Sequence, residues 1–215
     1  MVTPQETPGN LSERVIISPP KFAIVTFNLV GISPYVQLRF SEKAKAQMRE
    51  KMVAGSQARK GRQREARDFE QDFVAAQYQS DEGWSGIPAG AFRSAAISAC
   101  RIVGFKMTMA KLSLFVEADG VDSVDGTPLV RIEGTPESVE HAVRNATGVA
   151  DLRIRAMWRE WTAELRVRYD TEQFSISDVS NLLSRVGMQV GIGEGRPDSP
   201  KSEGMGWGLF RLSQT

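Results

Sequence analysis

Apolar and polar residues alternate in several stretches of this chain, which is typical of β-strands. Residues 21–30 carry apolar side chains on both faces, as Phe22 and Ile24 alternate with Ala23. This suits a central strand of a sheet. Residues 151–157 and 162–169 also alternate and are separated by only a few residues, so we expect them to form an antiparallel hairpin.

Helical spacing appears in two other segments. Residues 91–103 place Phe92, Ala96 and Cys100 on one side of a helical wheel, so we expect Cys100 to be a buried thiol. Ser177 is a suitable N-cap for a second helix that ends near Gly187. Shorter elements are expected at 112–116, 129–132 and 209–212 (strands) and at 136–145 (a helix that carries His141).

The strong elements follow the order strand, helix, strand, strand, helix, strand. This is the order of the ferredoxin-like split βαβ unit, and it predicts an α+β protein. We expect residues 1–20 to form a flexible arm and residues 21–215 to form a single domain. In this interpretation residues 41–85 and 105–150 are insertions into the core.

Composition narrows the class of protein. The chain has 215 residues with 41% hydrophobic residues, which is sufficient for a core, and a formal net charge of +1, which gives no global field. No apolar run has the length of a membrane span, and the start lacks the pattern of a signal peptide. A single cysteine does not suggest an oxidising compartment. We therefore expect a cytoplasmic protein, in a bacterial or phage-infected host cell, with no membrane partner.

Positive charge is concentrated in the first predicted insertion. Up to Arg67, its Lys and Arg residues are opposed only by Glu42, Glu50 and Glu65. Such a segment can contact phosphates. The candidate phosphate ligands in it are Lys43, Lys45, Arg59, Lys60, Arg62 and Arg64.

The predicted hairpin supplies a second basic surface. Alternation would bring four arginines to one face of neighbouring strands, and like charges so close repel unless water or an anion compensates. These residues are Arg153, Arg155, Arg166 and Arg168. Either the face is an ordinary exposed polar surface, or a phosphate backbone lies across it.

A glycine-rich loop, residues 187–208, precedes the last predicted strand. Glycines allow a backbone to approach a ligand closely and to present N–H groups to phosphates. Gly191, Gly193, Arg196 and Lys201 are candidate contacts, and Trp207 is a candidate for stacking on a base. The alternative is that the glycines serve turns and that Trp207 packs in the core.

Catalytic groups are sparse. His141 is the only histidine, and no His or Cys cluster has metal-ligand spacing. Asp119, Asp122 and Asp125 do not match a calcium loop, and a solvated acidic loop explains them better. The sequence indicates no enzyme, no cofactor and no metal.

Two motifs, together with the element order, resemble the RAMP superfamily, whose members form the RNA-binding backbone of CRISPR effector complexes. One is the segment Ile87-Pro88-Ala89-Gly90-Ala91-Phe92-Arg93 at the start of the first core helix; the other is the glycine-rich loop before the last strand. The resemblance implies a protein that lines up along a single-stranded guide, with Arg93 as a further candidate contact. The short chain, and the absence of an alignable catalytic histidine or aspartate, favour a stand-alone phage or prophage relative.

Three functional hypotheses follow. The first is a single-stranded RNA- or DNA-binding protein that assembles side by side into a homo-oligomer or filament, with phosphate contacts that are independent of sequence. The second is a phage structural or protein-interaction subunit that does not bind nucleic acid. The third is a nuclease that uses Asp119, Asp122 or His141.

Overall fold

The larger sheet of the protein is antiparallel and contains a ferredoxin-like core. The computed structural model describes residues 18–39, 46, 49, 68–144, 150–199 and 204–213. The four core strands are β1 (Phe22–Gly31), β4 (Leu114–Glu117), β9 (Thr162–Asp170) and β10 (Phe210–Leu212). They lie in the order β10-β1-β9-β4, so the fourth, first, third and second strands of the core are neighbours. The predicted α+β, ferredoxin-like fold is confirmed.

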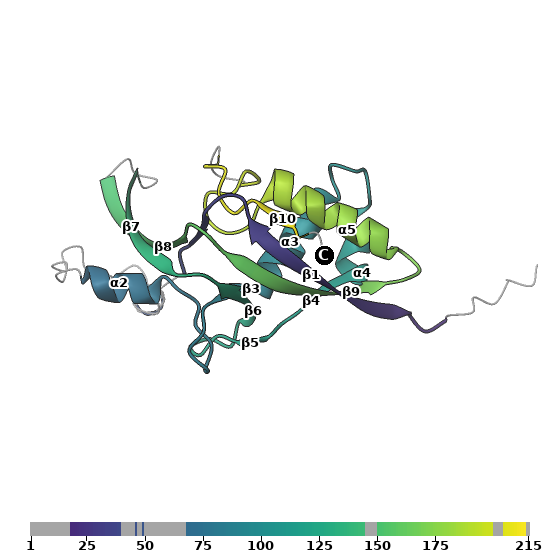
Figure 1. Ribbon diagram of the computed structural model, residues 1–215, viewed down its shortest axis with the longest axis horizontal. Coiled ribbons are helices and arrows are strands. Elements are labelled where there is room, and N and C mark those ends of the chain that lie inside the picture. The colour runs from purple at the N-terminus through teal and green to yellow at the C-terminus, as the bar shows by residue number, and fades with distance from the viewer. Residues whose placement is uncertain are drawn as a thin grey trace, which may run out of the picture.

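Two helices cover one face of this sheet. Helix α3 (Ala89–Ala99) lies between the first and second core strands along the chain, and α5 (Ile176–Arg185) lies between the third and fourth (Figure 1). The N-cap of α5 is Ser175 rather than the predicted Ser177, because Ser175 and Asp178 form a reciprocal capping box. Residues 1–17 of the predicted arm lie outside the described residues.

The core forms where the inward faces of the strands meet the helices. Leu165 and Val167 of β9 are buried against residues such as Phe92 of α3 and Leu183 of α5. Burial of a large apolar side chain contributes about 1.5–3 kcal/mol. Cys100 is buried beside this cluster, as predicted, and burial raises the pKa of its thiol.

The predicted hairpin of residues 151–157 and 162–169 is wrong. Strand β8 (Ala150–Trp158) belongs to a second sheet, in which it lies between β2 (Tyr35–Gln37) and β7 (Pro136–Arg144). Both edges of β8 are therefore occupied. The edges of β9 are also occupied, by β1 on one side and by β4 and β6 on the other. The two segments follow one another in sequence but pair in different sheets.

The predicted helix at 136–145 is also wrong. These residues form β7, which pairs with β8 over nine positions that include His141 opposite Arg153. The ladder to β8 overrides the weak helical preference of the segment. The pair of strands extends to one end of the molecule (Figure 1).

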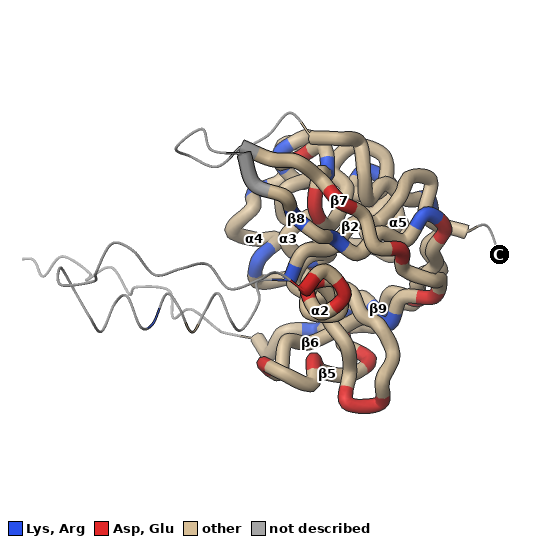
Figure 2. Tube along the Cα trace, turned by 90° about the vertical axis from the view of Figure 1, so that its left-hand side faces the viewer, with Lys and Arg blue, Asp and Glu red and all other residues tan. Residues whose placement is uncertain are grey.

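The remaining elements surround the core and the second sheet. They are α2 (Phe69–Ala75), β3 (Gly86–Pro88), α4 (Met107–Ser113), β5 (Gly120–Val121), β6 (Pro128–Glu133) and the π-helical turn η2 (Val186–Val190). Acidic residues are prominent along α2, as the red segments in Figure 2 show, and Glu70 and Asp72 occupy its first turn. Within the described residues, no helix is long and apolar enough to cross a membrane.

Candidate nucleic-acid interface

A groove of about 660 Å³ separates α3 from the second sheet. Most of its lining comes from three segments: the exposed side of α3, the strand β2 with Leu38, and residues 192–198 of the glycine-rich loop. Tyr78, Arg101 and Met107 complete the lining, so the groove is formed by parts of the chain that are distant in sequence.

Helix α3 presents small and polar groups to the groove. Gly90, Ser94, Ser98 and Arg101 line it, and the first three share one side of the helix because they are spaced by four residues. Pro88 at the N-cap makes no side-chain hydrogen bond to the first turn. The first backbone N–H groups of a helix have no partner within the helix and favour anions.

Two uncharged side chains of β2, Tyr35 and Gln37, line the groove and are joined by a hydrogen bond. The side-chain amide of Gln37 donates to Tyr35 Oη at 3.0 Å and to the carbonyl of Gly86 at 2.9 Å, and it accepts from the backbone N–H of Tyr78 at 3.0 Å. Burial raises the pKa of Tyr35, although the hydrogen bond from Gln37 opposes the shift. The phenol therefore stays protonated.

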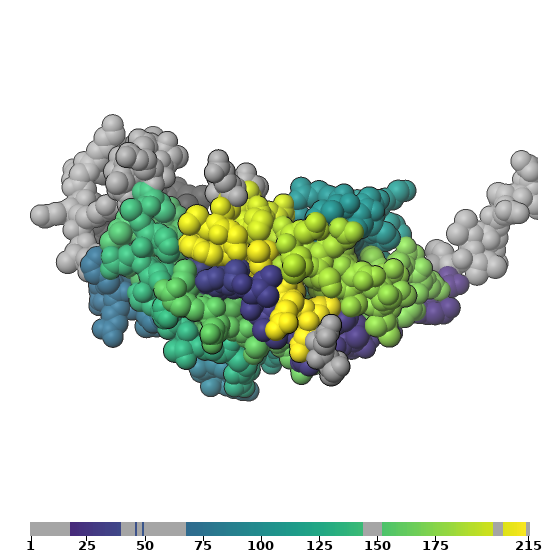
Figure 3. Space-filling view, turned by 45° about the horizontal axis from the view of Figure 1, so that its top comes forward, coloured from purple at the N-terminus to yellow at the C-terminus, as the bar shows by residue number. Residues whose placement is uncertain are grey.

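The glycine-rich loop is held by its own backbone. The N–H of Glu194 donates to the carbonyl of Val36 at 2.9 Å, and the N–H of Gly208 donates to the carbonyl of Pro34 at 2.7 Å. Gly193 has a φ of +76°, and a Cβ there would lie 2.6 Å from the carbonyl oxygen of Val36. The loop lies between the β7–β8 pair and α5 on the surface that Figure 3 shows. Gly193 thus allows close packing of the loop against β2.

Two arginines stand at the groove, and both have partners within the chain. Arg196 donates from Nη1 to the carbonyl of Gly193 at 2.9 Å. Arg101 contacts Asp198, with 2.7 Å between Nη2 and Oδ1, and it donates to Ser98 Oγ at 2.5 Å. Ser98 in turn donates to Asp198 Oδ2. The loop is therefore pinned to the end of α3.

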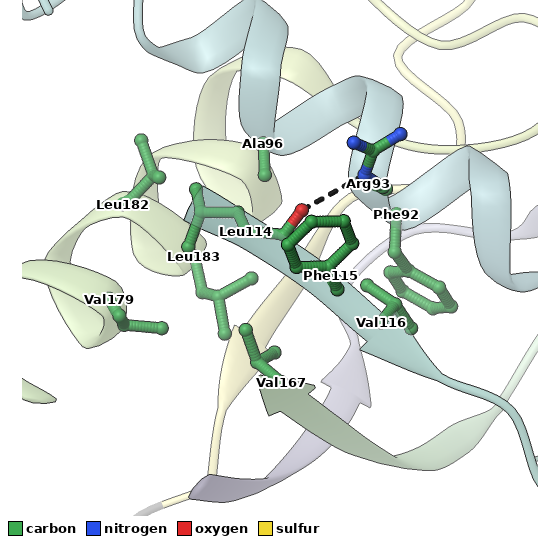
Figure 4. Close-up of a pocket in the computed structure, with 10 residues that line it drawn as sticks. All are labelled: Phe92, Arg93, Ala96, Leu114, Phe115, Val116, Val167, Val179, Leu182 and Leu183. Atoms are coloured by element: carbon green, nitrogen blue, oxygen red, sulfur yellow. Dashed lines mark hydrogen bonds between the residues drawn. The ribbon is translucent and has the colours of Figure 1, made fainter. Parts of the chain in front are cut away.

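Arg93 lies away from the groove. Its Nε donates to the carbonyl of Leu114 at 2.9 Å, and its guanidinium lies 5.0 Å from the ring centroid of Phe115. Figure 4 shows this side chain among the apolar residues between α3, α5 and β4. Arg93 thus connects α3 to β4.

Arg166 and Arg168 lie on the sheet face opposite the helices, and both are neutralised. Arg166 pairs with Asp119 at 2.8 Å and Arg168 pairs with Glu117 at 2.7 Å. Arg168 also lies between the rings of Phe22 and Phe115, at 5.0 and 4.5 Å from their centroids.

Arg153 and Arg155 lie on β8, in the other sheet, so the predicted face of four arginines does not exist. Arg155 is 8% exposed, and its guanidinium is 3.8 Å from Glu194. Burial lowers its pKa, while Glu194 opposes the shift.

Trp207 is half-buried and contacts other residues of the chain. A Cβ at Gly195 would lie 2.4 Å from its ring, and the ring meets His141 edge-on, with 5.2 Å between the centroids. Burial lowers the pKa of His141, and the charge of Arg155 lowers it further. Gly191 is buried in the same loop.

The basic candidates of the first insertion fall outside the described residues. They are Lys43, Lys45, Arg59, Lys60, Arg62 and Arg64, and Lys201 of the loop is outside as well. The described chain ends at Arg39 and resumes at Asp68, apart from residues 46 and 49. Leu38, next to the first of these ends, lines the groove, and so does Tyr78, which follows the second end after α2.

The aspartates that the nuclease hypothesis names form ion pairs with arginines of the chain. Asp122 is 2% exposed and lies 2.8 Å from Arg39, which also lies 3.3 Å from Asp125. Asp119 binds Arg166. In the part of the chain that the structure describes, no three His, Cys, Asp or Glu side chains form a group that could hold a metal ion.

Sequence reasoning missed the groove residues Ser94, Ser98, Arg101 and Asp198. A signal for the first three was present, because residues spaced by four and three positions share one helix side. Asp198 gave no such signal, since its position depends on how the loop returns to α3.

Comparisons with known proteins find distant similarity to solved structures. No family model and no curated protein matches the chain. A chain in a solved structure, "Cryo-EM structure of the Type III-B Cmr-beta bound to cognate target RNA", is 10% identical, with a TM-score of 0.48. The match covers 90% of this chain and 60% of that one, so this chain spans less than two thirds of its length.

Proposed function

We propose that this protein is a RAMP-type, non-enzymatic protein that binds single-stranded RNA or DNA in the groove between α3 and the glycine-rich loop. The observation that carries the proposal is the position of the groove. Its wall includes Leu38, which comes just before the stretch 40–67, and Tyr78, which follows that stretch only after α2. The stretch with the densest positive charge in the sequence therefore begins close to a residue of the groove wall.

The two parts have different roles in this proposal. Lys and Arg of the basic segment neutralise phosphates and supply most of the affinity, because counterion release dominates binding to nucleic acids. The groove supplies hydroxyls, backbone N–H groups and the guanidinium of Arg196, which hold the strand in one register. None of these groups reads base edges, so we expect little dependence on sequence.

Side-by-side assembly along one strand belongs to the same proposal. In this proposal the strand continues from the groove of one copy to the groove of the next. The protein would work in the cytoplasm of a bacterial or phage-infected cell as a homo-oligomer or filament.

The experiment compares two variants that each lose four positive charges. One carries Arg59→Gln, Lys60→Gln, Arg62→Gln and Arg64→Gln. The control carries Arg131→Gln, Arg159→Gln, Arg185→Gln and Arg211→Gln, four exposed arginines that do not line the groove. Binding of labelled single-stranded RNA and DNA is followed by fluorescence anisotropy.

We expect the first variant to lose affinity and to lower the log–log salt slope by about 0.7 for each lost phosphate contact. The control should stay near the wild type. Equal losses in both variants would show that only net charge matters and would reject a site at the groove.

A protein-interaction subunit is the second candidate. The sheet face opposite the helices exposes Ile24 (60%) and Phe22 (38%), and exposed apolar residues in a group are typical of contact surfaces. Ile24→Ser would weaken association with a protein partner and leave nucleic-acid binding unchanged.

A further inference from the structure

The pair of Ser98 and Arg101 is arranged as an anion site, and the chain fills it with its own carboxylate. Both side chains bind Asp198: Arg101 through Nη2 to Oδ1 at 2.7 Å, and Ser98 through its hydroxyl to Oδ2. A guanidinium and a hydroxyl that grip the two oxygens of one carboxylate also present the donors that a phosphodiester requires.

This cluster stands between two hollows. Ser98, Arg101 and Asp198 line the groove of about 660 Å³ and also a second hollow of about 310 Å³ beyond it. The second hollow is completed by Ile102, Gln189, Val190 and Pro197. If Asp198 moved out, the two hollows would become continuous along the end of α3.

The ion pair between Arg101 and Asp198 connects the loop to α3, and its exposure allows a ligand anion to replace Asp198. The Arg101 side chain is 58% exposed and the Asp198 side chain is 35% exposed, so water and salt screen the pair. A surface pair of this kind can be displaced by a ligand that brings its own negative charge. Arg101 is required for that exchange, because the site lies at the C-terminal end of α3, where the helix dipole disfavours anions.

We propose that Ser98 and Arg101 form a phosphate subsite for a single-stranded nucleic acid, and that Asp198 is a built-in competitor that keeps the subsite closed until a strand displaces it. This inference rests on the proposed function, since it names the phosphate contact and its regulation at the same groove. When the strand binds, a phosphate oxygen accepts the hydrogen bonds that Asp198 accepts in the free protein. The loop then turns away from α3.

The test removes the Asp198 carboxylate and measures whether the affinity for single-stranded nucleic acid rises. A damaged fold would lower this affinity and would not raise it. Asp198→Asn removes the charge and keeps the size of the side chain. The matched control is Glu133→Gln, which removes one negative charge from an exposed pair with Arg131 (2.8 Å) on β6. A labelled uridine homopolymer is titrated with each protein by anisotropy at several salt concentrations.

We expect Asp198→Asn to bind roughly two- to five-fold more tightly than the control, the range that corresponds to one exposed ion pair. Its log–log salt slope should match that of the wild type, because the same phosphate is neutralised in both complexes and only the competing carboxylate is lost. Arg101→Gln should cost more affinity in the Asp198→Asn background than in the wild type, because only there is Arg101 available without competition. Asp198→Ala and a thermal melt of each variant guard against local unfolding.

The outcomes separate the two proposals. If no protein binds the homopolymer at low salt, the proposed function fails. If the wild type binds but Asp198→Asn and Asp198→Ala match the control, the groove is used without this subsite and the inference is overturned.

Discussion

At the scale of single residues, most described arginines that were predicted to meet phosphates are already bound within the chain. Arg93 holds a backbone carbonyl, Arg155 faces Glu194, and Arg168 pairs with Glu117. The sequence shows which residues carry charge. It does not show their partners, because these come from strands and loops that are distant in the chain.

Asp122 supports the structure, and its removal tests this role. The carboxylate is buried, pairs with Arg39 and accepts hydrogen bonds from the N–H groups of Val124 and Asp125 at 3.1 Å. Removing one partner of a buried pair costs about 3–5 kcal/mol. We expect Asp122→Ala to lower the free energy of unfolding by about 3 kcal/mol in urea titrations. Glu133→Ala, in an exposed pair, should change it little, and equal effects would refute the buried role.

His141 reports on its surroundings without ambiguity, because it is the only histidine. Burial and the charge of Arg155 lower its pKa. In the unfolded chain the pKa should be about 6.5. The unfolded state therefore binds the proton first as the pH falls, so His141 contributes stability above pH 6.5 that is lost on acidification. NMR titration of the ring proton should give a native pKa below 6.5; a native value at or above it would contradict the described environment.

At the scale of elements, local sequence patterns predicted where the main strands and helices lie. The apolar alternation of β1 and β9 and the spacing of α3 and α5 led to the correct fold class. The partner of each strand was not predictable in the same way, because β8 and β9 have similar alternation but their edges are occupied by different neighbours. Likewise, the sequence of β7 has only weak alternation of apolar and polar residues, and its pairing with β8 makes it a strand.

A comparison of two glycines of the loop distinguishes the energetic cost of close packing from the cost of a left-handed backbone. Gly208 and Gly206 both have positive φ, but only at Gly208 would a Cβ collide, at 1.8 Å from the carbonyl oxygen of Ile192. We expect Gly206→Ala to cost about 1–2 kcal/mol for the left-handed backbone. Gly208→Ala should cost about 3 kcal/mol or more, because overpacking is added. Thermal unfolding compares the two; equal costs would mean that Gly208 is not packed against the backbone of Ile192 as described.

At the scale of the whole molecule, the ferredoxin-like sheet supports α3, and the second sheet supports the glycine-rich loop across from it. The strand β2 forms the wall of the groove across from α3, and it is held there by its pairing with β8 in the second sheet. The sequence showed that the loop and the helix start are unusual. It did not show that they face each other, because this depends on how the two sheets meet.

Assembly along a strand makes a prediction of its own. Sedimentation of complexes with single-stranded oligonucleotides of increasing length should give masses that rise in steps of one 23.7 kDa protomer. The reason is that each added stretch of strand offers one more groove-length site. A complex of fixed size at every length would instead favour a closed oligomer and the protein-interaction role.

The most direct test of the central claim is the salt dependence of binding to single-stranded nucleic acid. Wild-type protein is titrated against labelled single-stranded RNA and DNA between about 50 and 200 mM salt, and the logarithm of the association constant is plotted against that of the salt concentration. Contact with several phosphates predicts a straight line with a slope of about −0.7 for each phosphate neutralised. Affinity that does not change with salt, or no binding at the lowest salt, would contradict the account.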